Sequence, residues 1–177
     1  MDRIGYAVPK QVLSFETLRK AGLRYLERYA ASTNAFKSVL RRKVIRMEGD
    51  LEQRSVEVDK WIGEIVSRFT KAGLLNDNLV AENLCSSLLR RGTSLKMIKA
   101  KLAAKGFERD IISRVLGDIS GEQEELEAAF LVARRKRLGP YREKEERKAN
   151  RNRDLGVLAK AGFPYSISKQ VIDSFET

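Results

Sequence analysis

The sequence offers few side chains that could carry out catalysis or bind a metal ion. It contains no histidine, which removes the commonest general base and the commonest metal ligand. Its single cysteine, Cys85, lies in an apolar helical pattern, and no histidine is present to activate it. One cysteine can form neither an internal disulfide nor a cysteine-based zinc site. We therefore expect Cys85 to be a small buried residue in a protein from a reducing compartment.

Acidic residues crowd one short stretch, but a helix start explains them better than catalysis does. They are Glu122, Glu124, Glu125 and Glu127. Paired carboxylates can act as general acid and base, whereas acidic residues in a first helical turn interact favourably with the helix dipole. An apolar helical pattern follows directly, which favours the second explanation.

Phosphate-binding loops are also missing from the sequence. Neither a Gly-x-Gly-x-x-Gly nor a Walker pattern surrounds Gly162-Phe163-Pro164, the segment that comes nearest to one. The sequence therefore predicts a protein that is not an enzyme and that needs no cofactor and no metal ion.

The charge balance favours an anionic partner. Lys and Arg total 35 against 24 acidic residues, which gives a formal charge of +11, and the pI is about 9.9. Such a protein suits nucleic acid or the acidic face of another protein. A solvated, soluble surface explains the charge alone equally well.

The basic residues that we expect to contact a partner lie at predicted helix ends and on predicted exposed faces. Between residues 134 and 153, ten Lys or Arg residues stand against three Glu residues. A solvated helix pair, with these glutamates paired to neighbours, is the alternative for this segment. Tyr141 is its only aromatic residue, so base stacking there is weakly supported. The candidate contact residues are Arg41, Arg42, Lys43, Arg90, Arg91, Lys96, Lys99, Lys101, Lys105, Arg134, Arg135, Lys136, Arg137, Arg147, Lys148, Arg151 and Arg153.

Helical periodicity extends along almost the whole chain, without the alternation that is typical of strands. Residues 1–13 are expected to form a flexible lead-in, and Ser14 caps the first helix. A polar loop over residues 46–57 precedes a helix capped by Asp59, and Ser166 caps the last helix. No apolar run approaches the roughly 18 residues of a membrane span. The N-terminal residues also lack a signal-peptide core, so we expect a cytoplasmic protein.

A repeated turn divides the helical pattern. Lys105-Gly106-Phe107 and Ala161-Gly162-Phe163 occupy equivalent places, each three residues after a leucine, Leu102 or Leu158. Leu40 takes this place in the first part of the chain, where Val44-Ile45 replaces the Gly-Phe pair. The pattern predicts an all-α fold, an elongated tandem array of three three-helix modules. Its modules are residues 14–73, 74–119 and 120–177.

Residues 92–116 also suit a helix-turn-helix that reads DNA, which is the main alternative. A recognition helix must present several polar side chains to base edges. The second helix of this stretch devotes Ile111, Ile112, Val115 and Leu116 to packing. A general basic helical protein that binds nucleic acid without a protein partner therefore remains the second functional hypothesis.

Several motifs in one order and spacing resemble the RecX family of recombinase regulators, from about Phe15 to Phe175. They are Tyr25-Leu26, Ala72-Gly73-Leu74-Leu75-Asn76-Asp77, Gly92-Thr93-Ser94, Ile98, Leu102, Lys105-Gly106-Phe107, Leu158 and Gly162-Phe163. The first module departs from the family pattern, because its junction between second and third helices is longer and lacks the Gly-Phe turn.

The resemblance implies three tandem three-helix modules that bind the RecA recombinase filament along its helical groove. There the protein would dampen ATP hydrolysis, co-protease activity and strand exchange, and so modulate recombination, DNA repair and the SOS response. Single-stranded DNA is the second implied partner, contacted through its phosphate backbone and bound weakly without the recombinase. We expect a monomer that does not bind membranes.

Overall fold

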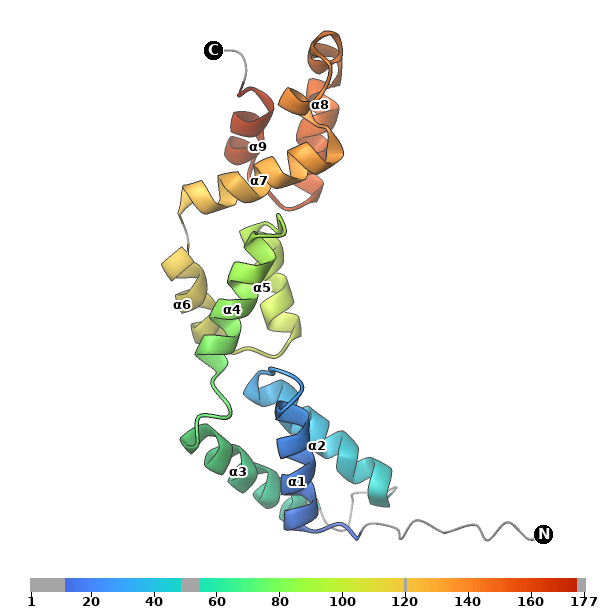
Figure 1. Cartoon of the computed structure of the whole chain (residues 1–177), viewed down its shortest axis with the longest axis vertical. Helices are drawn as coiled ribbons and strands as arrows, with labels where there is room; N and C mark the ends of the chain where they lie inside the picture. Colours follow the sequence, from blue (N-terminus) through green and yellow to red (C-terminus); the bar gives the residue numbers. More distant parts are fainter. Residues whose placement is uncertain (1–11, 49–54, 120, 175–177) are drawn as a thin grey trace, which may run out of the picture. The chain divides into compact units, whose positions relative to one another are not determined.

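A computed structural model of the 177-residue chain describes residues 12–48, 55–119 and 121–174. These residues contain nine α-helices and one short 3-10 helix, and no strand (Figure 1). The prediction of an all-α fold is confirmed. None of the helices in these ranges is long and apolar enough to cross a membrane. The contacts divide the chain into two compact units, residues 1–76 and residues 77–177.

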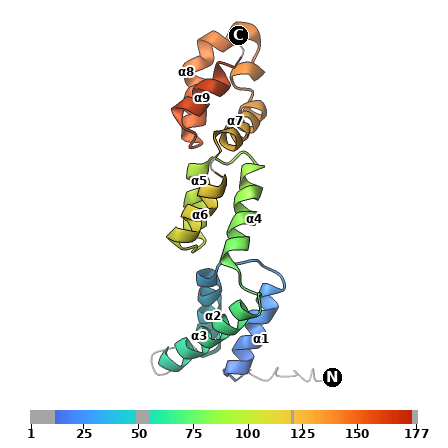
Figure 2. The ribbon, with the colours of Figure 1, turned by 90° about the vertical axis from the view of Figure 1, so that its left-hand side faces the viewer.

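Over residues 12–48 and 55–76, the first unit contains three helices. They are α1 (Phe15–Leu26), α2 (Thr33–Glu48) and α3 (Ser55–Lys71), and α2 packs against both of the others (Figure 2). Its core is Leu13, Leu18, Phe36, Leu40, Val44, Val58, Ile62, Ile65, Phe69 and Leu75. Leu13 was expected in a flexible lead-in, but it is 4% exposed because it packs within this core. Residues 1–11 of the predicted lead-in lie outside the described residues.

The Ser14 side chain caps α1 as predicted, whereas the predicted cap at Asp59 is wrong. Ser14 Oγ accepts a hydrogen bond from the Thr17 N–H at 3.2 Å, as expected for a cap. The third helix begins at Ser55, one turn before Asp59, because Val58 extends its buried row by a turn. The Asp59 carboxylate instead accepts a hydrogen bond from Arg41 of α2, with Nη2 at 3.0 Å. The predicted loop over residues 46–57 is therefore too long, and its centre, 49–54, lies outside the described residues.

The described part of the second unit contains six α-helices and the short 3-10 helix around one continuous core. The helices are α4 (Asp77–Leu89), α5 (Leu95–Ala104), α6 (Arg109–Ile119), α7 (Glu122–Lys136), η1 (Gly139–Tyr141), α8 (Lys144–Lys160) and α9 (Tyr165–Ile172). Within this unit α7 packs on α9 and also contacts α4, so the helices on both sides of residue 120 share the core. The proposed boundary between the second and third modules falls inside this unit. The predicted cap at Ser166 is wrong: α9 begins at Tyr165, directly after Pro164.

The two Gly-Phe turns have the same hydrogen-bond pattern. Gly106 and Gly162 adopt positive φ angles of 80° and 92°, a conformation that favours glycine. Phe107 N–H donates to the Leu102 carbonyl, and Phe163 N–H donates to the Leu158 carbonyl, each at 3.2 Å. This is the Schellman pattern of helix termination. Leu102 and Leu158 are both 0% exposed.

The Ser94 side chain, at the start of α5, bonds the residue that follows α8. Ser94 Oγ donates to the Ala161 carbonyl at 2.8 Å and accepts from the Met97 N–H at 3.4 Å. A Cβ atom on Gly162 would lie 2.6 Å from this oxygen, so the turn requires glycine for space as well as for its φ angle. Helix α5 is thereby held against the α8–α9 turn.

Candidate functional site

The cysteine and the acidic residue Glu125, both considered above as reactive groups, are buried and contribute to the fold. Cys85 lies in the core of the second unit, and burial raises the pKa of its thiol. Among the described residues, no group of three His, Cys, Asp or Glu side chains is arranged to hold a metal ion. Glu125 is 9% exposed, and its carboxylate accepts a hydrogen bond from the Leu95 N–H at 3.2 Å. The positions of the basic residues therefore define the candidate surfaces.

The lysines of α5 are exposed and lie on two sides of its buried row. Ile98 and Leu102 of this helix are 0% exposed. Lys105 directly follows α5, and its N–H donates to the Lys101 carbonyl at 3.1 Å, so these two lysines, four residues apart, lie together. The other lysines of the helix are Lys96 and Lys99, which are also exposed.

Two arginine-rich helix ends meet in the second unit. Arg90 and Arg91 follow α4, while the second cluster ends α7, and all of these side chains are exposed. Arg135 Nη1 donates to the Arg91 carbonyl at 3.4 Å, which brings the two ends together. Positive charge at a helix C-terminus is favourable because of the helix dipole. The α7 cluster is Arg134, Arg135, Lys136 and Arg137.

Arg137 has an unusual backbone conformation. Its φ of 53° and ψ of 55° place it in the left-handed region, and it is the only described non-glycine residue with a positive φ. Leu138 N–H donates to the Ala133 carbonyl at 2.9 Å, as in the glycine turns. An arginine thus occupies a place that glycine takes at Gly92, Gly106 and Gly162.

The basic segment 134–153 also contains arginines that hold the fold together. Asp154 is 0% exposed and accepts hydrogen bonds from the Gly139 N–H at 2.8 Å and from Arg142 Nε and Nη2 at 2.7 and 2.9 Å. Burial alone raises the pKa of the Asp154 carboxyl, but the bonds from Arg142 and Gly139 outweigh it and bring the pKa below its usual value. Arg142 is therefore a structural residue.

Two predicted contact residues in this segment are also engaged internally. Arg147 donates to the carbonyls of Arg142 and Pro140, both at 3.0 Å. Arg151 pairs with Asp173 of the segment after α9, and the hydrogen bond from Arg151 lowers the pKa of the Asp173 carboxyl. The exposed candidates that remain in this helix are Lys148 and Arg153.

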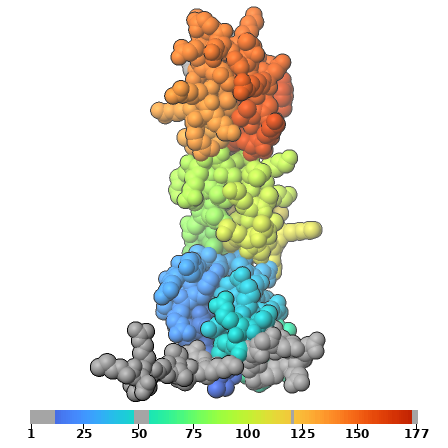
Figure 3. All heavy atoms as spheres, turned by 90° about the vertical axis from the view of Figure 1, so that its right-hand side faces the viewer, coloured from blue at the N-terminus to red at the C-terminus, as the bar shows by residue number. Residues whose placement is uncertain are grey.

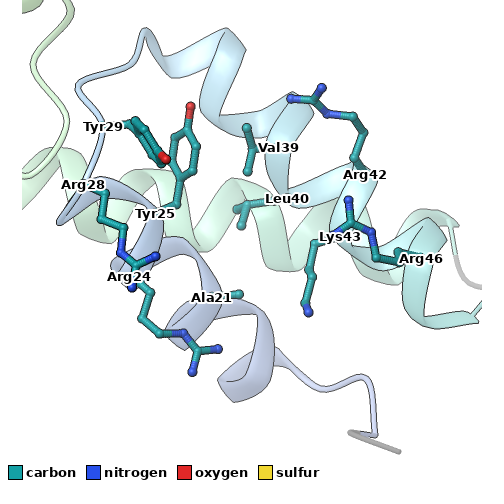
Figure 4. Close-up of a pocket in the computed structure, with 10 residues that line it drawn as sticks. All are labelled: Ala21, Arg24, Tyr25, Arg28, Tyr29, Val39, Leu40, Arg42, Lys43 and Arg46. Atoms are coloured by element: carbon teal, nitrogen blue, oxygen red, sulfur yellow. The ribbon is translucent and has the colours of Figure 1, made fainter.

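The third predicted cluster, on α2, contributes to a groove. Arg41 pairs with Asp59, whereas Arg42 and Lys43 line a groove between α1 and α2 (Figure 4). Three further arginines and two tyrosines line the same groove. They are Arg24, Arg28, Arg46, Tyr25 and Tyr29.

These additional groove residues were not predicted from the sequence. On α1 and just beyond it, Arg24 and Arg28 are four residues apart, and so are Tyr25 and Tyr29. This interleaving of basic and aromatic residues is a signal that could have been recognised. The pairing of α1 with α2, which brings Arg46 to the same place, is a tertiary contact without a local signature.

The helix-turn-helix alternative is disfavoured by the surroundings of α6. Ile112 and Val115 are 3% and 1% exposed, and α6 packs against both α4 and α5. Arg114, one of its few outward basic residues, donates a hydrogen bond to Asn78 of α4. The helix therefore contributes mainly to the core, as its apolar pattern predicts.

Comparison with known sequences identifies similar regulatory proteins. No family model matches the chain. It is 39% identical over 158 residues to the regulatory protein RecX of Myxococcus xanthus (strain DK1622), covering 89% of this chain and 84% of that protein. It is 31% identical over 116 residues to the regulatory protein RecX of Lactococcus lactis subsp. cremoris (strain MG1363), and this match covers 65% of the chain and 43% of the relative.

Solved structures share the fold. The crystal structure of RecX from Lactobacillus salivarius matches with a TM-score of 0.69 and 20% identity, covering 92% of this chain and 96% of that one. A second crystal structure, of a regulatory protein RecX, matches with a TM-score of 0.66 and 18% identity, covering 90% and 71%.

Proposed function

The chain belongs to the RecX family of regulatory proteins, and on this premise we propose that it binds the RecA recombinase filament on DNA and inhibits it. The inhibited activities are ATP hydrolysis, co-protease activity and strand exchange, through which the protein modulates recombination, DNA repair and the SOS response. It acts as a cytoplasmic monomer and uses neither a cofactor nor chemistry of its own.

One observation carries this proposal: the 39% identity to the RecX protein of M. xanthus over 89% of the chain. The match covers most of both proteins, so it concerns the whole arrangement of helices and not one local motif. The absence of histidine and the burial of Cys85 are consistent with a protein that acts by binding.

We place the recombinase contact on the basic surfaces of the second unit. The exposed lysines of α5 and the joined arginine ends of α4 and α7 offer positive charge on a rigid support. Such charge speeds association with an acidic protein face and fixes the orientation in which the two proteins bind. Its effect on the association rate and on specificity is larger than its effect on the affinity. Arg147 and Arg151 contribute indirectly, because their internal hydrogen bonds hold α8 in place.

The mechanism that we propose is steric and allosteric. Buried apolar rows hold the helices of each unit together, so each unit behaves as a rigid insert between recombinase protomers. A rigid insert opposes the changes in filament geometry that hydrolysis and strand exchange require, provided that it binds one filament state more tightly than the other.

The test adds the protein to a RecA filament on single-stranded DNA and follows ATP hydrolysis. We expect hydrolysis to fall at stoichiometric amounts of the protein. Unchanged hydrolysis at that ratio would refute the proposal.

A pair of charge-reversal variants tests the assigned surface. Changing Lys101 and Lys105 to glutamate should raise the concentration for half inhibition by roughly tenfold, which corresponds to about 1.4 kcal/mol. The matched control changes Lys60 and Lys71 to glutamate, two exposed lysines of the first unit. Equal effects of the two double variants would assign the change to net charge and not to this surface.

A further inference from the structure

The groove between α1 and α2 is a concave site of its own in the first unit. Its volume is about 650 Å³, which lies within the range of roughly 300–1,000 Å³ that is typical of ligand sites. Ala21, Val39 and Leu40 form its apolar part. The atoms of α1 and α2 form one continuous surface in the space-filling view (Figure 3).

The charge in this groove is of one sign. Five cationic side chains line it, and no acidic residue does. Among the described residues, none of the five forms an ion pair with an acidic side chain. They line the groove from α1, from the turn after it and from α2 (Figure 4). The five are Arg24, Arg28, Arg42, Lys43 and Arg46.

The cations are arranged in two rows. Arg24 and Arg28 are four residues apart near the end of α1, and Arg42 and Arg46 are four residues apart on α2. The pair on α2 has Cβ atoms about 5–6 Å apart on one helix face, whereas Arg28 lies in the turn that follows α1. Two rows of regularly spaced cations suit a chain of regularly spaced anions, such as the phosphates of a nucleic-acid strand.

Aromatic rings complete the groove. The rings of Tyr25 and Tyr29 lie with their centroids 5.2 Å apart and are tilted by 39°. Tyr25 also packs near Phe36 of the core, at 6.3 Å between centroids, so it is held in place. Tyr29 is 57% exposed, which leaves its ring accessible from solvent.

We propose that this groove binds single-stranded nucleic acid, with phosphates on the five cations and a base stacked on Tyr29. Stacking on aromatic rings combined with a positive groove is the usual arrangement for single-strand binding without sequence preference. A peptide of Asp and Glu residues alone would use the cations but has no flat ring to place on Tyr29. Bases paired inside a duplex cannot reach a ring at the wall of a groove.

This site places the expected contact with a single strand on named residues of the first unit, and it uses none of the residues assigned to the recombinase contact. It gives the protein a direct contact with a DNA or RNA strand. Binding should therefore persist in a variant whose recombinase contact has been removed from the second unit.

The test measures fluorescence anisotropy of a labelled oligothymidylate about 15 nucleotides long, without recombinase. Changing Arg42 and Arg46 to alanine should weaken binding and make the log–log salt slope shallower by about 1.4, because each phosphate contact on a single strand contributes roughly 0.7. The matched control changes Lys60 and Lys71 to alanine and should leave the slope unchanged. An oligouridylate of the same length distinguishes RNA from DNA, and binding of either strand supports the proposal.

The stacking of a base on Tyr29 is tested separately. The control strand is an abasic oligonucleotide of the same length, which has phosphates but no bases. Tyr29→Ala should weaken binding of oligothymidylate about 5-fold or more, and Tyr29→Phe should not, because stacking is worth at least about 1 kcal/mol per base. Neither variant should change binding of the abasic strand.

Three results would overturn the proposal. They are an unchanged salt slope in the double arginine variant, equal effects of Tyr29→Ala on both strands, and binding of polyglutamate in preference to oligothymidylate. The recombinase assay is independent: if groove variants lose strand binding but still inhibit hydrolysis, both proposals stand. If wild type binds the strand but leaves hydrolysis unchanged, only the proposed function fails.

Discussion

Replacing Asp154 by alanine should destabilise the second compact unit by about 3 kcal/mol. Removing one partner of a buried ion pair costs roughly 3–5 kcal/mol, because the other charge stays buried without compensation. Asp154 is fully buried, whereas the Arg142 side chain keeps 19% exposure and lies 3.6 Å from the Glu146 carboxylate. Water and Glu146 can therefore compensate Arg142 in part, which places the loss at the lower end of the range.

The loss should appear in urea denaturation followed by far-ultraviolet circular dichroism. With a slope of about 1–3 kcal/mol per molar urea, a loss of 3 kcal/mol lowers the midpoint of the second unit by roughly 1–3 M. The single tryptophan, Trp61, packs against the core of the first unit. Its fluorescence therefore reports on the first unit, and its transition should keep the wild-type midpoint.

The pH dependence of stability gives a second test of the pair between Asp154 and Arg142. The pKa of the Asp154 carboxyl is below its usual value in the folded protein. A carboxyl with a depressed folded-state pKa contributes stability that is present above its unfolded-state pKa, about 3.9, and is lost as the pH falls through the folded-state value. The difference between wild type and Asp154→Ala should therefore be constant near neutral pH and shrink below about pH 4.

Two outcomes would refute this reasoning. An unchanged circular dichroism midpoint would show that the buried pair contributes nothing measurable. An equal shift in the Trp61 transition would show that the two units unfold together. The matched comparison is Asp173→Ala, which removes the partner of Arg151 from a more exposed pair and should cause a smaller loss.

Three further substitutions test the fold by urea denaturation. Leu102→Ala should cost about 2–5 kcal/mol, because the side chain is 0% exposed, and a loss below about 0.5 kcal/mol would contradict its place in the core. Arg137→Gly should stabilise the protein by roughly 0.5–1 kcal/mol. Glycine adopts the left-handed backbone conformation without strain, and this gain exceeds the conformational entropy that the more flexible glycine loses on folding. A destabilised variant would contradict this. Burial raises the pKa of the Glu125 carboxyl in the folded protein. Glu125 therefore contributes most to the free energy of unfolding when it is protonated, and this contribution is lost as the pH rises through the folded-state pKa. Glu125→Gln should therefore gain stability relative to wild type as the pH rises above the ordinary glutamate pKa of about 4.3, and a relative loss would oppose this explanation.

The sequence predicted the features of the fold that have local signatures. Gly106 and Gly162 mark helix ends because their positive φ angles disfavour other residues, and Leu102 and Leu158 are buried as their spacing indicates. The start of α3 was misplaced because a polar first turn, from Ser55, resembles a loop when read without its partner helix.

Features that depend on tertiary contacts could not be predicted in the same way. The pairing of Asp154 with Arg142 spans twelve positions in a segment that contains many other basic residues, so the sequence does not single it out. Arg151 and Arg147 carried the same charge signal as Lys148, yet internal hydrogen bonds occupy them. The candidate groove required knowledge that α1 lies against α2, and only Arg42 and Lys43 of its cations were anticipated.

The hydrogen bond from Ser94 to the Ala161 carbonyl, 67 positions later, has a consequence for synthesis on the ribosome. The chain emerges from its N-terminus, and domains generally fold as units during translation. The first unit has its own core within residues 12–75, so it can fold while the rest is still being made. The Ser94 hydroxyl has to wait for Ala161 to emerge, and until then the surface of α5 that meets the α8–α9 turn is uncovered. We therefore expect a nascent chain paused before Ala161 to contain a folded first unit followed by a segment that proteases cut readily.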